Sequence, residues 1–512
     1  MSHGHSDPDA GRAPLSDTVL LSMTTTPDPQ TRHHEVIVVG AGFAGIGAAI
    51  KLRQAGLDFL VLEKSAEIGG VWRDNSYPGC ACDVPSAFYS YSFAPNPRWS
   101  RFFARQGEIR DYTHAVADRF GVMPSVRVNH ELLAARWDSD QQVWRLQTSA
   151  GDYSARFVIM ACGPMHKPVT PRIKGIASFP GASFHSARWD HGCDLAGKRV
   201  AVIGSGASAI QFVPAIQPDV AHLTLFQRTP PWVLPKMDAP VSERWQRRFE
   251  RFPVLQHALR QMLYLAFEKL NNSLTRPRSR GKLQARALRN IHRTVKDERL
   301  RAVLTPDYAI GCKRILQSND WYRALVKENV DVVGGVAEVR GKTIIASDGS
   351  SCEADIIIYA TGFEVANPPV AEIITGVSGE TLATRWQGSP QAYLGTMVED
   401  CPNLFMMFGP NLYTFSSAFV MIEAQLKYIM SALRTLTSRR IRTVAVDPQS
   451  ARAFNDDVQA ALQTSVWNAG GCQSYFIDKN GRNSTNWPWT TGAMRRRLKR
   501  FRLKDYVVDS SR

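Results

Sequence analysis

The chain has 512 residues, of which 44% are hydrophobic and 21% are charged. These fractions are close to the average of globular proteins and exclude a disordered chain and a coiled coil. The length is typical of about three domain-sized units. No run of 18 apolar residues occurs, so the sequence predicts no integral membrane segment.

The net charge of +16 is unevenly distributed, because residues 241–301 carry 16 Lys and Arg against 5 Asp and Glu. Such an excess is compatible with nucleic acid, a membrane surface or anionic ligands. The segment contains no helix-turn-helix, zinc-finger or RNP-type pattern, so we expect no nucleic-acid partner. We interpret it as a solvated, basic helical region. A second basic stretch at 495–502 could touch a membrane surface, and we favour solvation there as well.

The first 33 residues lack the charged start, apolar centre and cleavage site of a signal peptide and are predicted to form a disordered tail. The eight cysteines include no C-x-x-C pair. The sequence therefore predicts no zinc ribbon and no dithiol redox pair, and we expect no metal site. Reduced thiols in a cytoplasmic enzyme are the resulting expectation.

The first of two glycine-rich turns follows a predicted strand at 36–39 and opens a predicted helix at 46–54. Its G-x-G-x-x-G pattern lets the backbone turn tightly and approach a pyrophosphate, which the N-terminus of the helix then binds. A second strand, 59–62, ends at an acid that can accept hydrogen bonds from a ribose. We expect this turn to bind a dinucleotide through Gly40, Gly42, Phe43, Ala44, Gly45 and Glu63.

A second turn of this kind follows a predicted strand at 199–203 and comprises Gly204, Ser205, Gly206, Ala207, Ser208 and Ala209. The next strand, 223–226, ends in Gln-Arg-Thr rather than in an acid. A guanidinium can bind a 2′-phosphate with two hydrogen bonds, whereas a carboxylate would repel it. We therefore assign an unphosphorylated ribose to the first site and NADPH to the second, with Arg228 and Thr229 beside it.

Two nucleotide sites in one chain imply electron transfer between two cofactors, and we assign FAD to the first site. The predicted fold is α/β, with two dinucleotide-binding (Rossmann-like) domains, the FAD domain being interrupted by the NADP domain. Apolar strands at 157–160 and 356–359 precede small-residue turns, as where a chain passes between domains. We place the FAD domain at 34–164 and 356–512. The NADP domain takes 165–355, with a helical insertion at about 241–304.

Residues 179–190 read FPGASFHSARWD and match F-x-G-x-x-x-H-x-x-x-W-[P/D]. With this motif and two ordered nucleotide turns, the chain strongly resembles the class B flavoprotein monooxygenases, and specifically the Baeyer–Villiger monooxygenases, over about residues 34–500. The resemblance implies that FAD, NADPH and O₂ convert ketones to esters or lactones through a C4a-peroxyflavin. His185 and Trp189 are expected to couple domain movement to the site, although a histidine between domains is commonly just a satisfied hydrogen-bonding residue.

Further stretches resemble the same family. Residues 69–85 lie along the flavin in relatives, and the resemblance implies flavin contacts by Gly70, Val71, Trp72, Asp83 and Tyr89. In Gly311–Ile315, it implies that Lys313 binds the NADP phosphate and that Arg314 contacts the peroxyflavin. Arg314 and Asp83 are the expected catalytic residues: the guanidinium would stabilise the developing oxyanion, and the carboxylate would orient it.

Departures from the family pattern leave the substrate open. Ile315 stands where many relatives have proline, and the loop 409–419 lacks their Gly-His-Asn-Ser run. Its Tyr413, Phe415 and Phe419 indicate either an apolar pocket or ordinary core packing. The stretch 467–489 resembles the C-terminal active-site loop of the family. Two alternatives stay open: a heteroatom (S/N) monooxygenase, and a catalytically degraded FAD/NADP-binding sensor or scaffold. We expect a monomer or homodimer that takes a small ketone and O₂.

Overall fold

The computed structural model describes residues 32–275 and 277–509. Of the predicted tail, residues 1–31 lie outside the described residues. The remaining two, Arg32 and His33, begin the first strand and pair with Tyr153 and Ser154. The predicted end of the tail is therefore wrong by two residues, because pairing with a neighbouring strand orders them.

The first sheet has eight strands in the order β17-β4-β5-β6-β1-β2-β3, with β18 also paired to β6. Its centre is parallel and fully buried, as continuous apolar runs such as 36–39 require. The strands are β1 (Arg32–Val39), β2 (Phe59–Leu62), β3 (Val126–Arg127), β4 (Leu132–Asp138), β5 (Val143–Thr148), β6 (Gly151–Met160), β17 (Ile374–Thr375) and β18 (Leu404–Met406).

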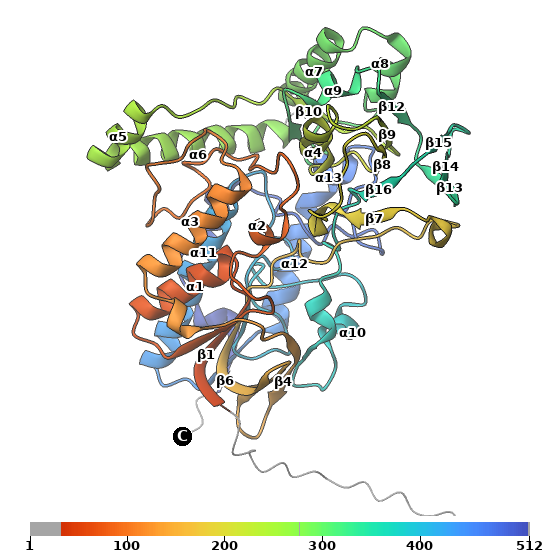
Figure 1. Ribbon diagram of the computed structural model, residues 1–512. Helices are drawn as coiled ribbons and strands as arrows, with labels where there is room; N and C mark the ends of the chain where they lie inside the picture. Colours follow the sequence, from red (N-terminus) through yellow and green to blue (C-terminus); the bar gives the residue numbers. More distant parts are fainter. Residues whose placement is uncertain (1–31, 276, 510–512) are drawn as a thin grey trace, which may run out of the picture.

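Three long helices pack beside this sheet in the lower part of the molecule (Figure 1): α1 (Phe43–Gln54), α3 (Gln106–Arg119) and α11 (Ala418–Ser438). The predicted first helix is confirmed but begins three residues earlier, at Phe43. Gly42 is its extended N-cap, so Gly45 lies inside the first turn. The helix N-terminus is thereby brought directly to the end of β1.

The second sheet is parallel and has the order β12-β9-β8-β16-β7. Its strands are β7 (Ala182–His185), β8 (Arg199–Ile203), β9 (His222–Phe226), β12 (Val330–Val333) and β16 (Ile356–Tyr359). The predicted domain boundary before Ile356 is wrong by one strand, because β16 lies between β8 and β7. The helices α4 (Ala209–Ile216) and α9 (Trp321–Leu325) pack against each other here. A small antiparallel sheet adjoins, made of β13 (Val336–Arg340), β14 (Thr343–Ala346) and β15 (Ser351–Glu353).

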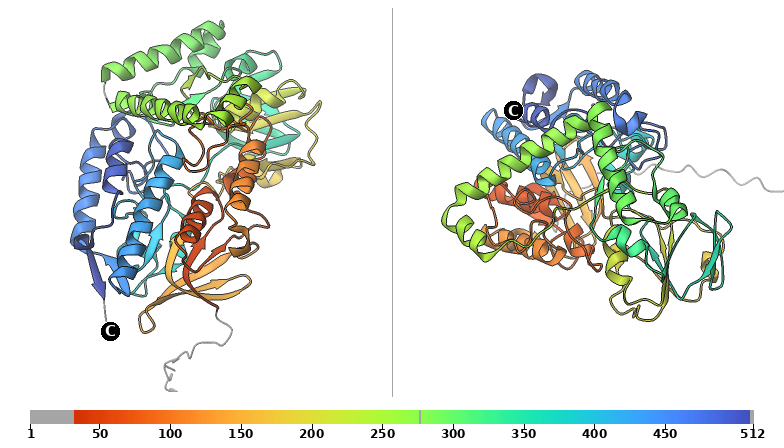
Figure 2. Two further views of the ribbon diagram at one scale, coloured as in Figure 1. Left: turned by 90° about the vertical axis from the view of Figure 1, so that its left-hand side faces the viewer. Right: turned by 90° about the horizontal axis from the view of Figure 1, so that it is seen from above.

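The predicted insertion at 241–304 is helical. It consists of α5 (Glu243–Arg251), α6 (Pro253–Thr275), α7 (Pro277–Thr294) and α8 (Glu298–Leu304). Figure 1 shows α5 and α6 at the upper left, above α3, and the view from above in Figure 2 shows the green helices of the insertion lying over the red and orange part of the chain. No helix in the described part of the chain is long and apolar enough to cross a membrane.

The remaining elements complete the two halves, and apart from α12 they are short. They are α2 (Val71–Asp74), α10 (Leu382–Trp386), α12 (Pro448–Gln463), α13 (Val466–Ala469), α14 (Thr491–Arg497), β10 (Val233–Leu234), β11 (Leu316–Gln317), β19 (Thr443–Val446) and β20 (Tyr506–Asp509). The strands β10 and β11 pair in parallel, and β11 follows Arg314 after one residue. This pairing fixes the segment that carries the predicted catalytic arginine.

Candidate active site

A cavity of about 620 Å³ opens at the carboxyl ends of β1, β2 and β6 and reaches the start of α4. Ligands of parallel α/β sheets bind at this edge. Thirteen predicted site residues line the cavity: Gly40, Gly42, Phe43, Ala44, Glu63, Gly70, Val71, Trp72, Asp83, Tyr89, Ala207, Ser208 and Arg314. The structure therefore brings together most of the first nucleotide site and both predicted catalytic residues.

The first glycine turn has the shape of a cradle for a phosphate group. Gly40 has φ +101°, and a Cβ there would lie 2.7 Å from the Ala161 carbonyl oxygen. A Cβ on Gly45 would lie 1.7 Å from the Gly40 oxygen, so the turn closes only with glycine at these two positions. Gly42 is different, because its Cβ would meet only Gly70 Cα, at 3.7 Å. Its side towards the cavity is open backbone, as a group that approaches closely requires.

Glu63 is buried at the end of β2 and its carboxylate is fixed by three donors. The Ala41 N–H donates to Oε2 over 2.8 Å, and the Ser65 N–H donates to Oε1 over 3.0 Å. The Arg73 guanidinium contacts Oε1 at 3.2 Å. These bonds hold the acid beside the glycine turn, where a ribose would pass.

The segment 69–89 closes over the first turn. A Cβ on Gly70 would lie 3.2 Å from Gly42 Cα, so the two turns touch through glycine. Farther along, Trp72 Nε1 donates to the Tyr89 hydroxyl over 3.1 Å, and the two rings meet edge to face. The aromatic pair forms a rigid wall of the cavity.

Arg314 and Asp83 form a two-pronged ion pair in the cavity wall. Arg314 Nε donates to Asp83 Oδ2 over 2.9 Å, and Nη2 donates to Oδ1 over 2.7 Å. Burial opposes the charged guanidinium, but Asp83 is the main group that favours it, through its charge and its hydrogen bonds, and the pKa of Arg314 lies well above its usual value. A permanent, oriented cation thus faces the cavity, the property that stabilisation of an oxyanion requires.

Of the second predicted nucleotide site, Ala207 and Ser208 line this cavity, and the other residues lie outside it, at the carboxyl edge of the second sheet. A Cβ on Gly204, which has φ +105°, would lie 2.6 Å from the Ala360 oxygen, so this turn also needs glycine. The Ser205 hydroxyl donates to the Thr229 carbonyl over 3.3 Å. Gly206 and Ala209 complete the turn, and Ala209 starts α4. This arrangement repeats the β1–α1 turn in the second sheet.

Two cations gather beside the second turn. Burial, and next the Arg228 guanidinium, lower the pKa of the Lys313 ammonium. The Lys313 Nζ also lies 5.0 Å from the centre of the Tyr308 ring. An anion bound near both groups would relieve this repulsion.

Sequence reasoning missed several residues of the site. Tyr77 donates to Gln211 Oε1 over 3.1 Å, and Gln211 also bonds both backbone groups of Ala81. These contacts join the 77–81 segment to α4 of the second sheet. Tyr413 and Tyr475 were predicted less precisely, Tyr413 as a residue of an apolar pocket or of the core and Tyr475 only as part of the stretch 467–489. No local pattern distinguishes these residues, because their partners are far away in the sequence.

In the loop 409–419 the structure shows both predicted alternatives, residues that line a pocket and residues that pack in the core. Tyr413 lines the cavity, whereas Phe419 is fully buried and packs against Phe43 with ring centres 4.5 Å apart. Phe415 stacks on Trp467 of the C-terminal segment. A smaller apolar chamber of about 70 Å³ adjoins, and its wall includes Tyr413, Tyr475 and Phe476.

His185 is the last residue of β7 in the second sheet and is buried. Its Nδ1 accepts the Ala187 N–H over 3.0 Å, and its ring lies 5.9 Å from that of Phe363. Burial lowers the pKa of His185 to about 4, so the ring is neutral. Trp189 packs against Phe184 and Phe212. Neither residue lines the cavity, which fits a structural role.

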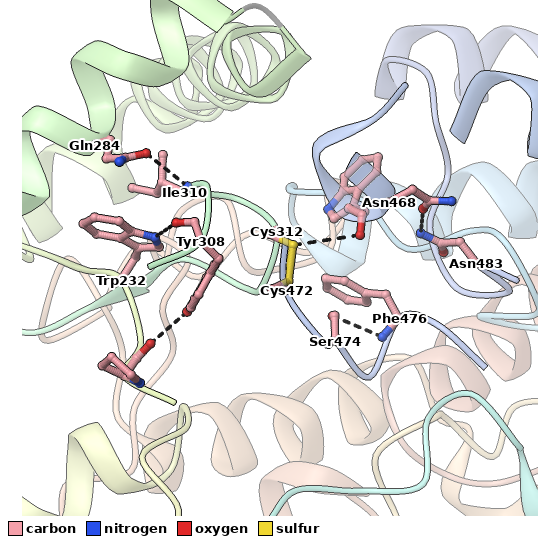
Figure 3. Close-up of a disulfide and its surroundings, with 12 residues drawn as sticks. Trp232, Gln284, Tyr308, Ile310, Cys312, Asn468, Cys472, Ser474, Phe476 and Asn483 are labelled. Carbon is pink, nitrogen blue, oxygen red and sulfur yellow. Dashed lines mark hydrogen bonds between the residues drawn. A yellow bond between two sulfur atoms is a disulfide. The ribbon is translucent and has the colours of Figure 1, made fainter. Parts of the chain in front are cut away.

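The prediction of reduced thiols is wrong for two of the eight cysteines. Cys312 and Cys472 form a disulfide, with their Cα atoms 6.1 Å apart (Figure 3). The two residues are 160 positions apart in the sequence, so no spacing pattern pointed to the pair. The other six cysteines are free.

Comparisons with known proteins agree with this geometry. Residues 37–262 match a family model described as pyridine nucleotide-disulphide oxidoreductase. A Baeyer–Villiger monooxygenase of Streptomyces coelicolor is 48% identical over 482 residues, which cover 93% of this chain and 93% of that protein. A Baeyer–Villiger monooxygenase of Pseudomonas aeruginosa is 43% identical over 498 residues, covering 96% and 94%. Among solved structures, OTEMO in complex with FAD and NADP has a TM-score of 0.85 at 26% identity, covering 94% of this chain and 100% of that one.

Proposed function

Because the chain belongs to the Baeyer–Villiger monooxygenases, we propose that Arg314 and Asp83 are the catalytic residues with which it oxygenates a ketone. It is an NADPH-dependent flavoprotein monooxygenase. The observation that carries the proposal is the two-pronged Arg314–Asp83 pair in the wall of the cavity that also contains the first glycine turn.

FAD fits the large cavity by the chemistry of its lining. The open backbone at Gly42 accommodates the pyrophosphate, and the fixed carboxylate of Glu63 accepts a ribose hydroxyl. Gly70, Val71, Trp72 and Tyr89 line the same cavity. When bound, FAD supplies the redox chemistry, taking electrons from NADPH and delivering an oxygen atom from O₂ to the substrate.

Arg314 acts on the substrate side of this chemistry. Attack on a ketone carbonyl places negative charge on its oxygen, and a fixed guanidinium stabilises that charge. Asp83 orients Arg314 by accepting from both Nε and Nη2, so the cation keeps one position without reorganisation. The residues Trp72, Tyr89 and Tyr413 narrow the cavity and exclude water from the reacting atoms.

NADPH binds the second turn in this proposal, with its 2′-phosphate between Arg228 and Lys313. Arg228→Ala is expected to raise KM for NADPH about 10- to 150-fold, the effect of losing a charged hydrogen-bond partner worth roughly 1.5–3 kcal/mol. The rate with NADH should stay within twofold, since NADH has no 2′-phosphate. Steady-state kinetics with both coenzymes measure this. Arg340→Ala is the control, since Arg340 is exposed on β13 and pairs with Glu338. Equal use of both coenzymes by the unmutated enzyme would contradict the assignment.

The apolar wall of the smaller chamber favours ketones with an aryl, cyclic or long alkyl substituent. A panel of such ketones, assayed for NADPH consumption and for products heavier by one oxygen atom, tests the function. Heteroatom oxidation is the second candidate, because a thioether needs no oxyanion stabiliser. Conversion of thioethers without any ester from the ketones would favour it.

We also propose a division into domains with the boundary corrected by one strand. The FAD domain takes residues 34–164 and the part after Tyr359, and the NADP domain takes 165–359, which includes β16. The cytoplasmic location, and the choice between monomer and homodimer, stay predictions.

A further inference from the structure

The disulfide lies at the base of two segments that reach the active site. Cys312 stands two residues before Arg314, and Cys472 stands three residues before Tyr475. Figure 3 shows the segment with Cys312 and the C-terminal loop meeting at the disulfide, close to Phe476. The bond therefore joins the segment with the catalytic cation to the loop that closes the apolar chamber.

The chain around the disulfide is packed without spare room. The Ala309 N–H donates to the Gly470 carbonyl over 2.9 Å. A Cβ on Gly470 would lie 2.7 Å from Cys312 Cβ and 2.3 Å from the Val466 oxygen. A Cβ on Gly311 would lie 2.9 Å from the Leu274 side chain. These close contacts fix the position of one segment relative to the other while the bond is intact.

Beyond Cys472, the loop places two aromatic rings at the site. Phe476 is buried and its ring lies 5.6 Å from that of Tyr413. Tyr475 packs on Phe476, with ring centres 4.4 Å apart, and forms part of the chamber wall. Tyr475 is 41% exposed while it also lines the chamber. The loop therefore separates this chamber from solvent.

We propose that the Cys312–Cys472 disulfide is a redox-controlled positioning element for ketone binding. Oxidised, it holds the Tyr475–Phe476 wall against Tyr413 beside Arg314; reduced, it releases that wall. The proposal rests on the proposed function of Arg314 and its cavity. Persistent disulfides are rare in reducing compartments, where those that occur are usually redox-sensing or transient, and this one is placed to report on the redox state.

The reducing step requires a dithiol. Cys472 is half-buried between two exposed residues, whereas Cys312 is fully buried. A dithiol thiolate attacks the Cys472 sulfur, the S–S bond breaks, and Cys312 leaves as a thiolate that takes a proton. The second thiol of the reductant then displaces Cys472. Two protein thiols and one reductant disulfide result, so the electrons balance.

The test compares the unmutated enzyme with Cys472→Ser, using Cys193→Ser as the matched control because Cys193 is a free, half-buried thiol elsewhere. In Cys472→Ser we expect KM for a converted ketone to rise at least fivefold, and flavin reduction by NADPH to stay within twofold. Reductant should give the unmutated enzyme the same high KM, change Cys193→Ser in the same way, and leave Cys472→Ser unaltered.

Two readouts do not depend on activity. Alkylation of the denatured protein should label six thiols without reductant and eight with it. Limited proteolysis of the native protein within 467–489 should accelerate after reduction. Eight labelled thiols without reductant, or an unchanged ketone KM in Cys472→Ser, would overturn the proposal. If no ketone is converted in either redox state, the proposed function fails instead, and labelling with proteolysis still decides whether the bond holds the loop.

A second inference rests on the outer face of the helical insertion. Large apolar side chains are exposed there in an unusual concentration: Trp245, Phe252, Val254, Leu255, Met262 and Leu265, each at least 40% accessible. On α6, residues 255, 258, 262, 265 and 266 follow helical spacing and form one stripe. We call this stripe with Phe252 and Trp245 the outer apolar face.

The segment that carries the outer apolar face is rich in cations. Arg244, Arg247 and Arg251 are exposed on α5. The other basic stretch of the sequence is on α14, which packs on the side of α6 that faces away from the stripe: the Gly492 N–H donates to Glu268, and Arg495 lies 5.3 Å from the centre of the Tyr264 ring. The fold thus places the arginines of α5 in the same insertion as the exposed apolar side chains, with a second basic helix packed on α6.

We infer that the outer apolar face docks on an anionic phospholipid bilayer. Exposed apolar side chains next to exposed arginines are complementary to such a bilayer, the apolar groups contacting hydrocarbon and the arginines contacting phosphate. A second copy of this chain would instead bring two cationic surfaces together. The bilayer also concentrates apolar ketones next to the enzyme.

Sedimentation with vesicles tests this inference. The enzyme should bind vesicles of phosphatidylglycerol and phosphatidylcholine, bind phosphatidylcholine alone at least tenfold more weakly, and dissociate as salt is raised. The double variant Met262→Glu, Leu265→Glu should bind anionic vesicles at least tenfold more weakly. Val377→Glu, at a position 52% exposed outside the face, should bind normally. Absence of vesicle binding, or a dimer that the double variant turns into monomer, would overturn the inference.

Discussion

Arg314→Ala is expected to stop ester formation while the protein stays folded and retains its flavin. The variant removes the only guanidinium in the cavity wall that pairs with Asp83, among the described residues. Loss of one oxyanion donor costs roughly 3–4 kcal/mol, or about 10²- to 10³-fold in rate. NADPH oxidation should continue and release hydrogen peroxide, because oxygen still reacts when no ester can form.

The measurement is ester by mass spectrometry beside peroxide release, at saturating NADPH. Arg314→Lys retains a cation but cannot pair with both oxygens of Asp83, so it should recover only part of the yield. Arg323→Ala is the control, since Arg323 is exposed on α9 and its nearest acid, Asp320, is 4.0 Å away. A normal ester yield from Arg314→Ala would show that another group stabilises the oxyanion.

Local patterns in the sequence were sufficient for the parts of the fold that form locally. The strand at 199–203 matches β8 residue by residue, and both glycine turns lie where strand, turn and helix follow each other. Local patterns do not predict which strands lie next to each other in a sheet. Ile356–Tyr359 is recognisable as a strand, but its place between β8 and β7 depends on pairing with distant residues. The predicted domain boundary was wrong for that reason.

The residues of the site also fall into those that a local pattern predicts and those that it does not. Glu63 and the glycines carry their chemistry in their spacing, so the sequence alone was sufficient to predict a role for them. Arg314 is one of 62 basic residues, and only the resemblance to a family singled it out; the structure then placed it on Asp83, a residue 231 positions away. Gln211 and the disulfide had no such signal. Each acquires its role from a contact that only folding creates.

Gly42→Ala is expected to give a folded protein that is poor in flavin. Gly42 has φ −79° and ψ −170°, a conformation that any residue adopts, and its Cβ would meet only Gly70 Cα, at 3.7 Å. Folding therefore does not require glycine here, but the added methyl group would occupy cavity space at the start of α1 where the pyrophosphate must approach. We expect FAD affinity to fall at least tenfold, equal to about 1.4 kcal/mol, as read from the flavin absorbance retained after gel filtration.

Two other glycines separate binding from folding. Gly45→Ala should lower the melting temperature of the protein even without flavin, because its Cβ would lie 1.7 Å from the Gly40 oxygen. Gly107→Ala should change neither property, since nothing lies within 4 Å of its Cβ position in α3. Full flavin content in Gly42→Ala would mean that the cofactor does not pass this turn closely. Thermal melting of the flavin-free proteins distinguishes the two effects: Gly42→Ala should melt with the unmutated chain, and Gly45→Ala below it.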